Sequence, residues 1–526
     1  MKRLVSIAAL VALSAIVAAG SRAANTLCVG GSGCYATLAA AINAAQDGNT
    51  IHVNAGTFAG GVTITKSVTL SGAGAQRTTI RGGGPVLTIG TMLGATEPKV
   101  SIDGVTITGG VTTSSPESEP FAGGDGVFAF GGGIDALPNA DFSGGANLKI
   151  TNSVITANRA TPTDSRPFGP PCPSDVPCPF AAAAGGGINT WGSLTLVNTT
   201  VSNNLAGGPV ASDAEGAGIS SFIGAVTIVN SSITGNDAHA TAPNGRFADS
   251  GGIFVRNGSL SMTGSTISNN DATLDAAYPD TVDMLAIGGG VHVGGGVTAA
   301  TITDTTISGN DATMTNTHGY TNAFSGGLHT DGVFTLTNDV ISKNSVHSHA
   351  TGANGDAFGD SGAGEMAGTL TNVRLTGNTV DVSSAGGNAS GSAGATIITG
   401  TITNGVVSGN HLTASAASGV TSLSGGGILT GGPLKLENTS VTQNDASPAG
   451  SSGTARGGGI FSVDLSPDGP PGGLLELTNS SVDHNSIIAS GGITRQGGGL
   501  YVTNPLKRTN ATISGNSPDD CAGTSC

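Results

Sequence analysis

The sequence predicts an all-β fold, a single-stranded right-handed parallel β-helix with stacked asparagine ladders. Three observations support this prediction. The 526 residues include 88 glycines, only 10% are charged and 4% are aromatic, which suits neither helices nor a thick layered core. One short motif, with Val, Ile or Leu three residues before an asparagine, recurs eleven times. An alternating apolar run, typical of a strand, precedes most copies.

Residues 1–23 have the pattern of a secretory signal peptide. Lys2 and Arg3 precede an apolar run from Leu4 to Ala19, and small residues follow at Ser21 and Ala23. A membrane anchor is the alternative, but the run is shorter than the ~20 residues that cross a bilayer. We therefore expect a protein that is secreted, extracellular or at the cell surface, with no membrane span.

The repeat defines the predicted β-helix, residues 51–516. Its first column contains asparagines at 158, 204, 236, 270, 310, 344, 378, 410, 444, 485 and 516. Six residues earlier lies a second column, made of Asn152, Asn198, Asn230, Gly264, Asp304, Asn338, Asn372, Asn404, Asn438, Asn479 and Asn510. Asn, Asp and Gly tolerate the left-handed backbone of a tight bend. The second column therefore predicts a turn in every unit.

Each unit is predicted to contain three strands. A glycine cluster with one aliphatic residue, such as "GGGI" at 185, starts the first, and the alternating run and the Ile-x-x-Asn motif form the others. Most units repeat every 31 to 41 residues, which fits one solenoid coil with a variable loop before the next glycine cluster. Coils stacked ~4.8 Å apart let the asparagine amides hydrogen-bond to one another. A propeller or a β-sandwich is the alternative architecture.

Six cysteines occur in three close pairs. They are Cys28 with Cys34, Cys172 with Cys178, and Cys521 with Cys526. In an exported chain this spacing predicts three local disulfides, the last of them in a C-terminal tail at 517–526. A metal site is the alternative, but the pairs are far apart along the chain and their spacing is wider than usual for zinc.

The glycine-glycine-aliphatic and x-x-Asn elements together resemble the repeats of chlamydial polymorphic outer membrane proteins. The three-strand coil is similar to the pectin lyase-like parallel β-helix superfamily. The segment from Cys34 to Gly84 resembles the start of secreted β-helix proteins. This resemblance implies an N-terminal cap, residues 24–50, with a short amphipathic helix that presents Leu38, Ala41, Ile42 and Ala45 to the open end of the core.

Two departures limit what the resemblance implies about function. The chain continues to "NATISGNSPDDCAGTSC" directly after its last repeat, so we expect it to lack the C-terminal β-barrel of the chlamydial proteins. The short catalytic motifs of polygalacturonases and pectate lyases are also absent. The sequence therefore favours a structural or adhesin-like function over enzyme activity, with a polysaccharide-active lyase, hydrolase or epimerase as the alternative.

The strand geometry predicts one clustered surface. If the aliphatic residue of the glycine-led strand points inward, the next residue points outward and stacks on its copies in neighbouring coils. That column contains Asn189, Ser220, Phe254, His292, His329, Glu365 and Thr396. Two residues further on lies a column with Trp191, Phe222, Arg256, Gly294, Asp331 and Ala367. We expect both columns to face solvent.

Two hypotheses compete for this surface, beside the simpler one that it only solvates the strands. A catalytic or metal centre would use His292, His329, Asp331 and Glu365 as acid, base or ligands. A carbohydrate-binding face would use Trp191, Phe222, Phe254 and Arg256. No cofactor and no metal site is predicted. Calcium is the alternative, but the acidic residues are too scattered to form a calcium-binding loop.

The net negative charge limits the classes of binding partner that we expect. Without residues 1–23, which include Lys2, Arg3 and Arg22, 16 basic residues face 34 acidic ones, and the formal charge is −18. Such a surface repels nucleic acid and anionic polysaccharides. Neutral glycans or a surface receptor are the expected partners.

Overall fold

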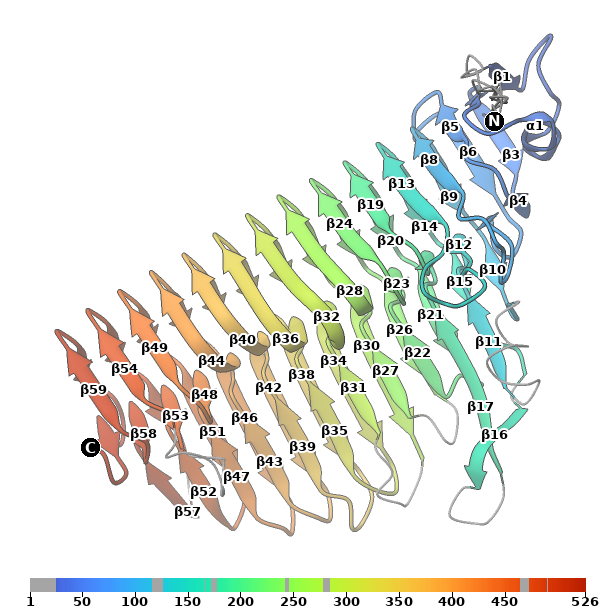
Figure 1. The fold of residues 1–526 in the computed structure, drawn as a ribbon. Coiled ribbons are helices and arrows are strands. Elements are labelled where there is room, and N and C mark those ends of the chain that lie inside the picture. Colours follow the sequence, from blue (N-terminus) through green and yellow to red (C-terminus); the bar gives the residue numbers. More distant parts are fainter. Residues whose placement is uncertain are drawn as a thin grey trace, which may run out of the picture.

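The structure is a computed structural model that describes residues 25–115, 126–164, 166–171, 177–241, 246–277, 284–463, 473–489 and 491–526. Strands of successive coils pair in parallel and build long sheets along the axis of the molecule (Figure 1). This arrangement confirms the predicted parallel β-helix. The predicted signal peptide and Cys172 lie outside the described residues, so the structure does not describe the predicted Cys172–Cys178 disulfide.

The glycine-led strand and the alternating strand of each coil belong to one 24-stranded sheet. Its strands are β1 Thr26–Val29, β2 Thr50–Val53, β4 Val62–Ile64, β5 Thr69–Gly72, β7 Leu87–Ile89, β8 Lys99–Asp103, β12 Ile134–Ala136, β13 Asn147–Thr151, β18 Ile188–Thr190, β19 Leu194–Val197, β23 Ile219–Ser221, β24 Ala225–Val229, β28 Ile253–Thr263, β32 Val291–Thr303, β36 Leu328–Thr337, β40 Gly364–Thr371, β44 Thr396–Thr403, β48 Ile428–Thr430, β49 Leu434–Glu437, β53 Ile460–Ser462, β54 Leu475–Thr478, β58 Leu500–Val502, β59 Leu506–Thr509 and β61 Cys521–Ala522.

The Ile-x-x-Asn strands form a 14-stranded sheet. It contains β3 Gly56–Ala59, β6 Thr78–Arg81, β9 Thr106–Thr108, β14 Val154–Thr156, β20 Thr200–Ser202, β25 Ser232–Thr234, β29 Thr266–Ser268, β33 Thr306–Ser308, β37 Val340–Ser342, β41 Arg374–Thr376, β45 Val406–Ser408, β50 Ser440–Thr442, β55 Ser481–Asp483 and β60 Thr512–Ser514.

The prediction of a variable loop in each coil was wrong, because these segments form two further sheets. An 11-stranded sheet contains β10 Val111–Thr112, β15 Arg159–Ala160, β21 Leu205–Gly208, β26 Asp237–Ala240, β30 Asp271–Ala276, β34 Asp311–Asn316, β38 Ser345–Ala350, β42 Thr379–Ser384, β46 His411–Ala416, β51 Asp445–Ala449 and β56 Ser486–Ile487. A 12-stranded sheet contains β11 Val127–Phe130, β16 Arg166–Pro171, β17 Pro177–Ala184, β22 Asp213–Glu215, β27 Phe247–Asp249, β31 Leu285–Ile287, β35 Thr321–Phe324, β39 Ala357–Asp360, β43 Ala389–Ser392, β47 Thr421–Ser424, β52 Ser452–Arg456 and β57 Gly492–Gln496.

The four sheets enclose two separate cores. The 24- and 14-stranded sheets bury mostly Ile, Leu and Val, whereas the 11- and 12-stranded sheets bury mostly alanine. Between the two cores the glycine clusters face the buried asparagines. A Cβ on Gly290 would lie 2.6 Å from the Gly327 carbonyl oxygen and 2.9 Å from the Asn310 side chain. The glycine clusters therefore allow the two halves of each coil to approach closely.

Both predicted asparagine columns stack along the axis, and the buried column is a continuous ladder. In the buried column, Nδ2 of Asn310 donates to Oδ1 of Asn344 at 2.9 Å, and every neighbouring pair from Asn158 to Asn516 repeats this bond. In the second column the backbone is left-handed, for example at Asn338 with φ +61°. Exposed amide contacts also link members of this column, such as Asn372 Nδ2 with Asn338 Oδ1 at 2.9 Å. The ladder prediction is confirmed.

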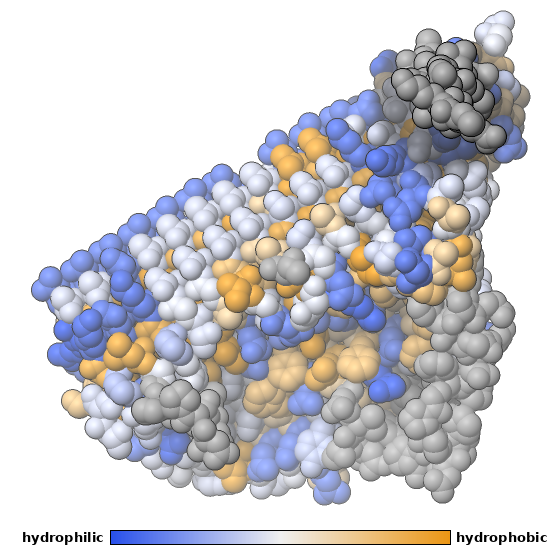
Figure 2. Space-filling model, in the orientation of Figure 1, coloured by the Kyte–Doolittle hydropathy of each residue, from blue (hydrophilic) through white to orange (hydrophobic). Residues whose placement is uncertain are grey.

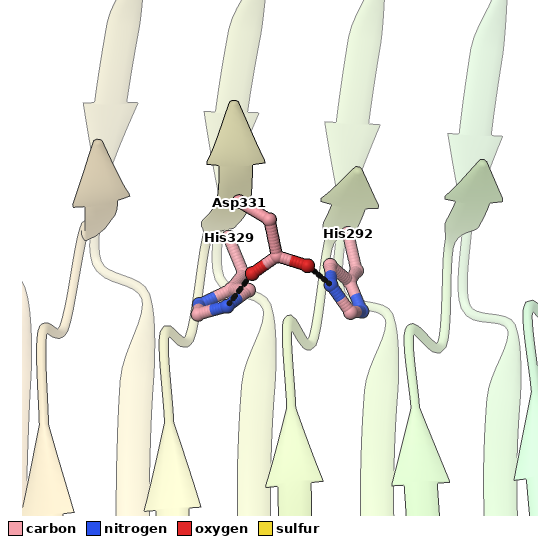
Figure 3. Close-up of side chains that lie close together, drawn as sticks. All are labelled: His292, His329 and Asp331. Atoms are coloured by element: carbon pink, nitrogen blue, oxygen red, sulfur yellow. Dashed lines mark ion pairs between the residues drawn. The ribbon is translucent and has the colours of Figure 1, made fainter. Parts of the chain in front are cut away.

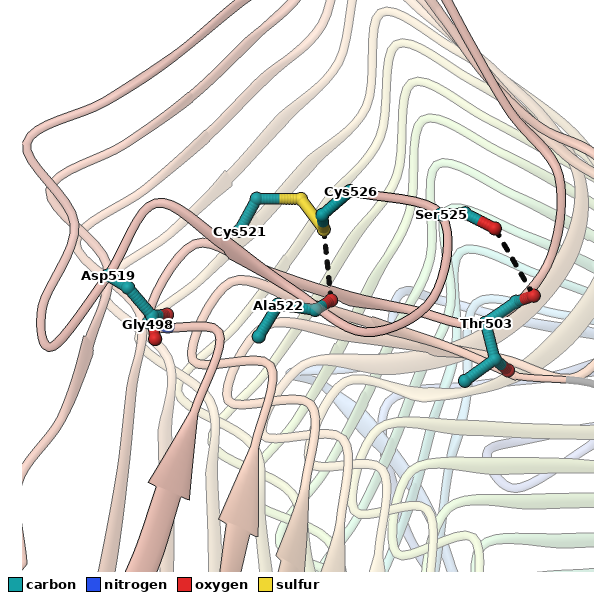
Figure 4. Close-up of a disulfide and its surroundings, with 7 residues drawn as sticks. All are labelled: Gly498, Thr503, Asp519, Cys521, Ala522, Ser525 and Cys526. Carbon is teal, nitrogen blue, oxygen red and sulfur yellow. Dashed lines mark hydrogen bonds between the residues drawn. A yellow bond between two sulfur atoms is a disulfide. The ribbon is translucent and has the colours of Figure 1, made fainter.

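The two ends of the solenoid differ. Helix α1, Leu38–Ala44, lies at the N-terminal end and buries Leu38, Ala41 and Ile42 against the core, as predicted (Figure 1). The disulfides Cys28–Cys34 and Cys521–Cys526 are formed. At the C-terminal end, Asp519 accepts the Gly498 N–H and Ser525 Oγ donates to the Thr503 carbonyl (Figure 4). Within the described ranges, no helix has the length and apolarity to span a membrane.

Candidate functional site

The glycine-led strands bring the predicted site residues together. In-register pairing of β23, β28, β32, β36 and β40 stacks Ser220, Phe254, His292, His329 and Glu365 in one column. Thr396 was placed wrongly in this column. Glu365 pairs with Ile397, and Thr396 is buried one residue earlier, where its hydroxyl donates to the Gly364 carbonyl.

The prediction that these columns face solvent was wrong for most of their members. His292 and His329 are only 8% and 9% exposed, and Phe254 is 5% exposed. The reason is the unpredicted 12-stranded sheet, whose outer side chains lie opposite them. Asp249 on β27 contacts His292 on β32, and Glu215 on β22 contacts Arg256 on β28. The two surfaces form a groove, and Figure 2 shows apolar side chains gathered in a hollow between the two halves of the molecule.

His292, His329 and Asp331 form a cluster in this groove, which we call the His–Asp cluster (Figure 3). The Asp331 carboxylate lies between the two imidazoles, 3.9 Å from Nε2 of His292 and 3.5 Å from Nε2 of His329. The two rings meet edge to face with centroids 4.8 Å apart. Glu365, also a predicted site residue, lies 3.9 Å from Nδ1 of His329.

The other nitrogen of each imidazole has its own partner. Nδ1 of His292 is 2.8 Å from both carboxylate oxygens of Asp249. Nδ1 of His329 is 3.0 Å from Oγ of Ser325, which also accepts the Glu365 backbone N–H at 3.2 Å. Nε2 of His292 is buried without a hydrogen-bond partner. Both rings are thus held so that Nε2 faces Asp331.

Burial and charge shift several pKa values in the groove. Burial disfavours the charged form of His292, but Asp249 and Asp331 outweigh this effect and raise its pKa to about 9. The neighbouring imidazoles of His292 and His329 hold the pKa of the Asp331 carboxyl well below its usual range. Burial, together with the neighbouring Glu215, raises the pKa of Asp213 to about 7. Burial also raises the pKa of Glu215, although the positive charge of Arg256 partly offsets this increase.

The predicted aromatic residues lie beside the cluster. Trp191 and Phe222 stack at a centroid distance of 4.4 Å, and Phe142 packs on Trp191 at 5.7 Å. Arg256 lies 5.2 Å from the Phe222 centroid and 5.6 Å from that of Phe254. Trp191 is only 6% exposed. Its stacking on neighbouring rings makes it part of a small apolar cluster rather than an open platform for sugars.

A cavity of about 310 Å³ opens next to these rings. Its walls include Phe128, Phe130, Phe180, Trp191 and Phe222, and Asp213, Glu215 and Arg256 supply its charged side. Glu215 pairs in register with Asp249, the partner of His292. The cavity therefore adjoins the His–Asp cluster one coil away along the same groove.

Sequence reasoning missed Asp213, Glu215, Asp249 and Ser325. Asp213, Glu215 and Asp249 lie on the 12-stranded sheet, in segments that were predicted as loops. A signal was present, because β22, β27 and β31 each place a buried alanine between two outer side chains. Such short alternation with small residues is easily overlooked.

A second group of possible metal ligands lies on the outer face of the 11-stranded sheet. His347, His349 and Asp381 bring donor atoms within 4.8 Å of one another and are partly exposed. His347 is 3.5 Å from Asp311 and 4.0 Å from Asp381. Sequence reasoning did not single out this group.

No protein-family model matches the chain, and no curated protein matches it. Among solved structures, it is similar to the A-module of a mannuronan C-5 epimerase from Azotobacter vinelandii. The identity is 12%, 93% of each chain is covered and the TM-score is 0.22. A similarity this low carries no argument about function, and the sequence resemblance to pectin lyase-like and chlamydial proteins stays a prediction.

Proposed function

We propose that the protein is an exported enzyme that hydrolyses a neutral polysaccharide bound along the groove. The observation that carries this proposal is the position of the His–Asp cluster next to a cavity with acidic and aromatic walls. A pocket with convergent titratable groups is the usual place for catalysis. The adhesin-like function favoured by the sequence becomes the second candidate.

The groove offers what a sugar chain needs. Aromatic side chains in the cavity wall can contact the apolar faces of sugar rings, and Asp213, Glu215 and Arg256 can bond to hydroxyl groups. The cavity is lined by residues from several successive coils, which suits an extended polymer better than a small molecule. A formal charge of −15 for the whole chain favours a neutral polymer over an anionic one.

The choice of reaction follows from the substrate class. Elimination and epimerisation remove a proton next to a carboxyl group, so both require a uronic acid. Hydrolysis of a neutral glycan instead needs a protonated acid and a group that activates water. Asp213, whose pKa is raised to about 7 by burial and Glu215, supports the role of acid. The His–Asp cluster supports the activation of water.

The test is turnover by the purified full chain on a panel of neutral and uronic acid polysaccharides. We expect new reducing ends from a neutral glycan, and no unsaturated product. Asp213→Asn should reduce turnover at least tenfold while glycan binding persists. Asp381→Asn, outside the groove, is the matched control and should keep full turnover.

The second candidate, binding without turnover, is favoured by the aromatic wall of the cavity. If no glycan is cleaved, but a bound glycan is lost with Phe222→Ala and retained with Asp213→Asn, the adhesin-like function replaces the enzyme. Turnover that survives in Asp213→Asn would contradict the proposed acid.

A further inference from the structure

We propose that the His–Asp cluster binds one divalent transition-metal ion, of the zinc class, through Nε2 of His292, Nε2 of His329 and the carboxylate of Asp331. The donor atoms already converge, since they all lie within 4.8 Å of one another. Zinc takes imidazole and carboxylate ligands at about 2.0–2.2 Å. Small side-chain rotations would bring these three donors to that distance around one ion.

The outer contacts are those of a metal site. A metal-binding histidine usually donates its second ring N–H to a carboxylate or another oxygen, which fixes the ring and its tautomer. Asp249 occupies this position at His292, 2.8 Å from Nδ1, and Ser325 Oγ occupies it at His329, 3.0 Å from Nδ1. When an ion replaces the proton on Nε2, Nδ1 stays protonated in both rings and each Nε2 offers its lone pair to the ion.

A second observation points to a missing ligand. Nε2 of His292 is buried, and the Asp331 carboxylate lies 3.9 Å away, too far for a hydrogen bond. An ion between the two would bind both groups and recover the free energy that the buried nitrogen costs. The carboxylates of Asp249, Asp331 and Glu365 around the two rings give the site a net negative charge that suits a cation.

The donor set decides the kind of ion. Calcium and magnesium prefer oxygen ligands, whereas imidazole suits zinc, copper, iron and nickel. Two imidazoles and one carboxylate therefore favour a transition metal over the calcium considered from the sequence. All three ligands come from the adjacent strands β32 and β36, whose register is fixed by the pairing of Val291 with Leu328 and His292 with His329. The ligands are thus held by neighbouring coils of one rigid sheet.

Three protein ligands leave at least one coordination position free. Asp331 is about half exposed, and the free position faces the groove. An open position is typical of catalytic zinc, which lowers the pKa of a bound water and makes it a nucleophile. This part of the inference rests on the proposed function, whereas metal binding itself does not.

The experiment measures metal binding by the full chain without any glycan. The protein is stripped with a chelator, dialysed against Zn²⁺ or Co²⁺, and its metal content and affinity are determined. To remove the second possible site, we use the background variant His347→Ala/His349→Ala. We expect one tightly bound equivalent in this background, and visible ligand-field absorption with Co²⁺.

Three groove variants then test the assignment. His292→Gln and His329→Gln should each abolish the tight equivalent and the Co²⁺ absorption. Asp249→Asn, which changes only the outer contact, should weaken the affinity about 10–100-fold. His411→Gln, an exposed histidine beside Asp445 outside the groove, is the matched control and should bind like its parent. Circular dichroism checks that each variant is folded.

The results separate the two proposals. No tight equivalent in the background variant, or one that persists in folded His292→Gln, would overturn the metal site. Glycan turnover by the metal-free protein would overturn the catalytic role of the ion and leave the proposed hydrolase standing. A tight equivalent that is lost in both histidine variants, in a protein that cleaves no glycan, would support the metal site and remove the hydrolase.

Discussion

A single buried asparagine shows how the coils are held together. Nδ2 of Asn344 donates to the Ile307 carbonyl and to Oδ1 of Asn378, and its Oδ1 accepts both the backbone N–H and Nδ2 of Asn310. One amide thus satisfies its own polar atoms and contacts the coils on both sides. Aspartate lacks the donor and glutamine is longer, which explains why the column uses only asparagine.

At the same scale, Asp213 should make stability depend on pH. Its folded pKa of about 7 lies above the ordinary value of about 3.9, because the side chain is buried beside Glu215, with Arg246 and Arg256 only partly compensating. Between pH 4 and 7 the folded state therefore binds the additional proton. The contribution of Asp213 to stability is therefore largest below pH 4 and falls as the pH rises to about 7.

We expect Asp213→Asn to remove the loss of folding stability that Asp213 causes as the pH rises. The variant should equal the wild type near pH 4 and exceed it at pH 8 by up to ~4 kcal/mol, at ~1.4 kcal/mol for each pKa unit. Urea unfolding at both pH values measures the difference. Asp275→Asn, half exposed on the 11-stranded sheet, is the control. Equal gains at pH 4 and pH 8 would contradict the prediction.

At the scale of the elements, the size of the buried side chains determines how closely the sheets of each half of a coil pack. The 11- and 12-stranded sheets are filled mainly by alanine, so they pack closely and form a thin second core. Glycine is needed where the chain passes between this core and the larger one. There a single added methyl group would meet the backbone of the next coil, as at Gly290.

Substitutions at two glycines distinguish the effect of close contact between coils from the effect of a left-handed backbone. Gly290→Ala should destabilise by ~3 kcal/mol or more, because its Cβ would meet the Gly327 carbonyl oxygen at 2.6 Å. Gly409→Ala has a φ of +62° but open space around the new Cβ, and should cost only ~1 kcal/mol. Urea unfolding midpoints compare the two variants. Equal effects would show that backbone conformation, and not coil spacing, governs the glycine clusters.

At the scale of the whole molecule, the end coil of a solenoid needs a cap that shields its apolar core and strand edges from solvent. Strands β1 and β2 lie at the N-terminal end of the described solenoid, and α1 packs over them. The helix is tied down from the next coil, where Lys66 Nζ donates to the Asn43 carbonyl at 2.9 Å. An uncovered end would expose apolar side chains and strand edges, which promotes association.

We expect Ile42→Asp to make the protein aggregate. Ile42 is 3% exposed, and a carboxylate at this position cannot stay in the core without a partner. The helix should detach, and size-exclusion chromatography with light scattering should show large species. Asn43→Asp, on the exposed side of the same helix, should elute like the wild type. The same elution for Ile42→Asp would argue against a capping role for the helix.

The candidate site was only partly predictable. The sequence placed Phe254, His292, His329 and Glu365 in one column, because strand register follows directly from the repeat. It did not indicate that Asp249 and Glu215 lie opposite, because these residues occur in segments whose length varies from coil to coil. The glycine-led strands and the strands of the 12-stranded sheet face each other across the groove only once the whole coil has folded.

The sequence by itself determined the coil, because a buried amide and a left-handed bend at fixed spacing repeat in every unit and leave few other ways to fold. Only the tertiary structure decided that the coils from β10 onward have a second core and that a groove lies between the sheets of the two cores. The physical reason is that periodicity records which side chains stack along the axis, whereas the path of the chain around the axis depends on packing between sheets. The burial of His292 beside Asp249, and with it the proposed metal site, belongs to that second kind of information.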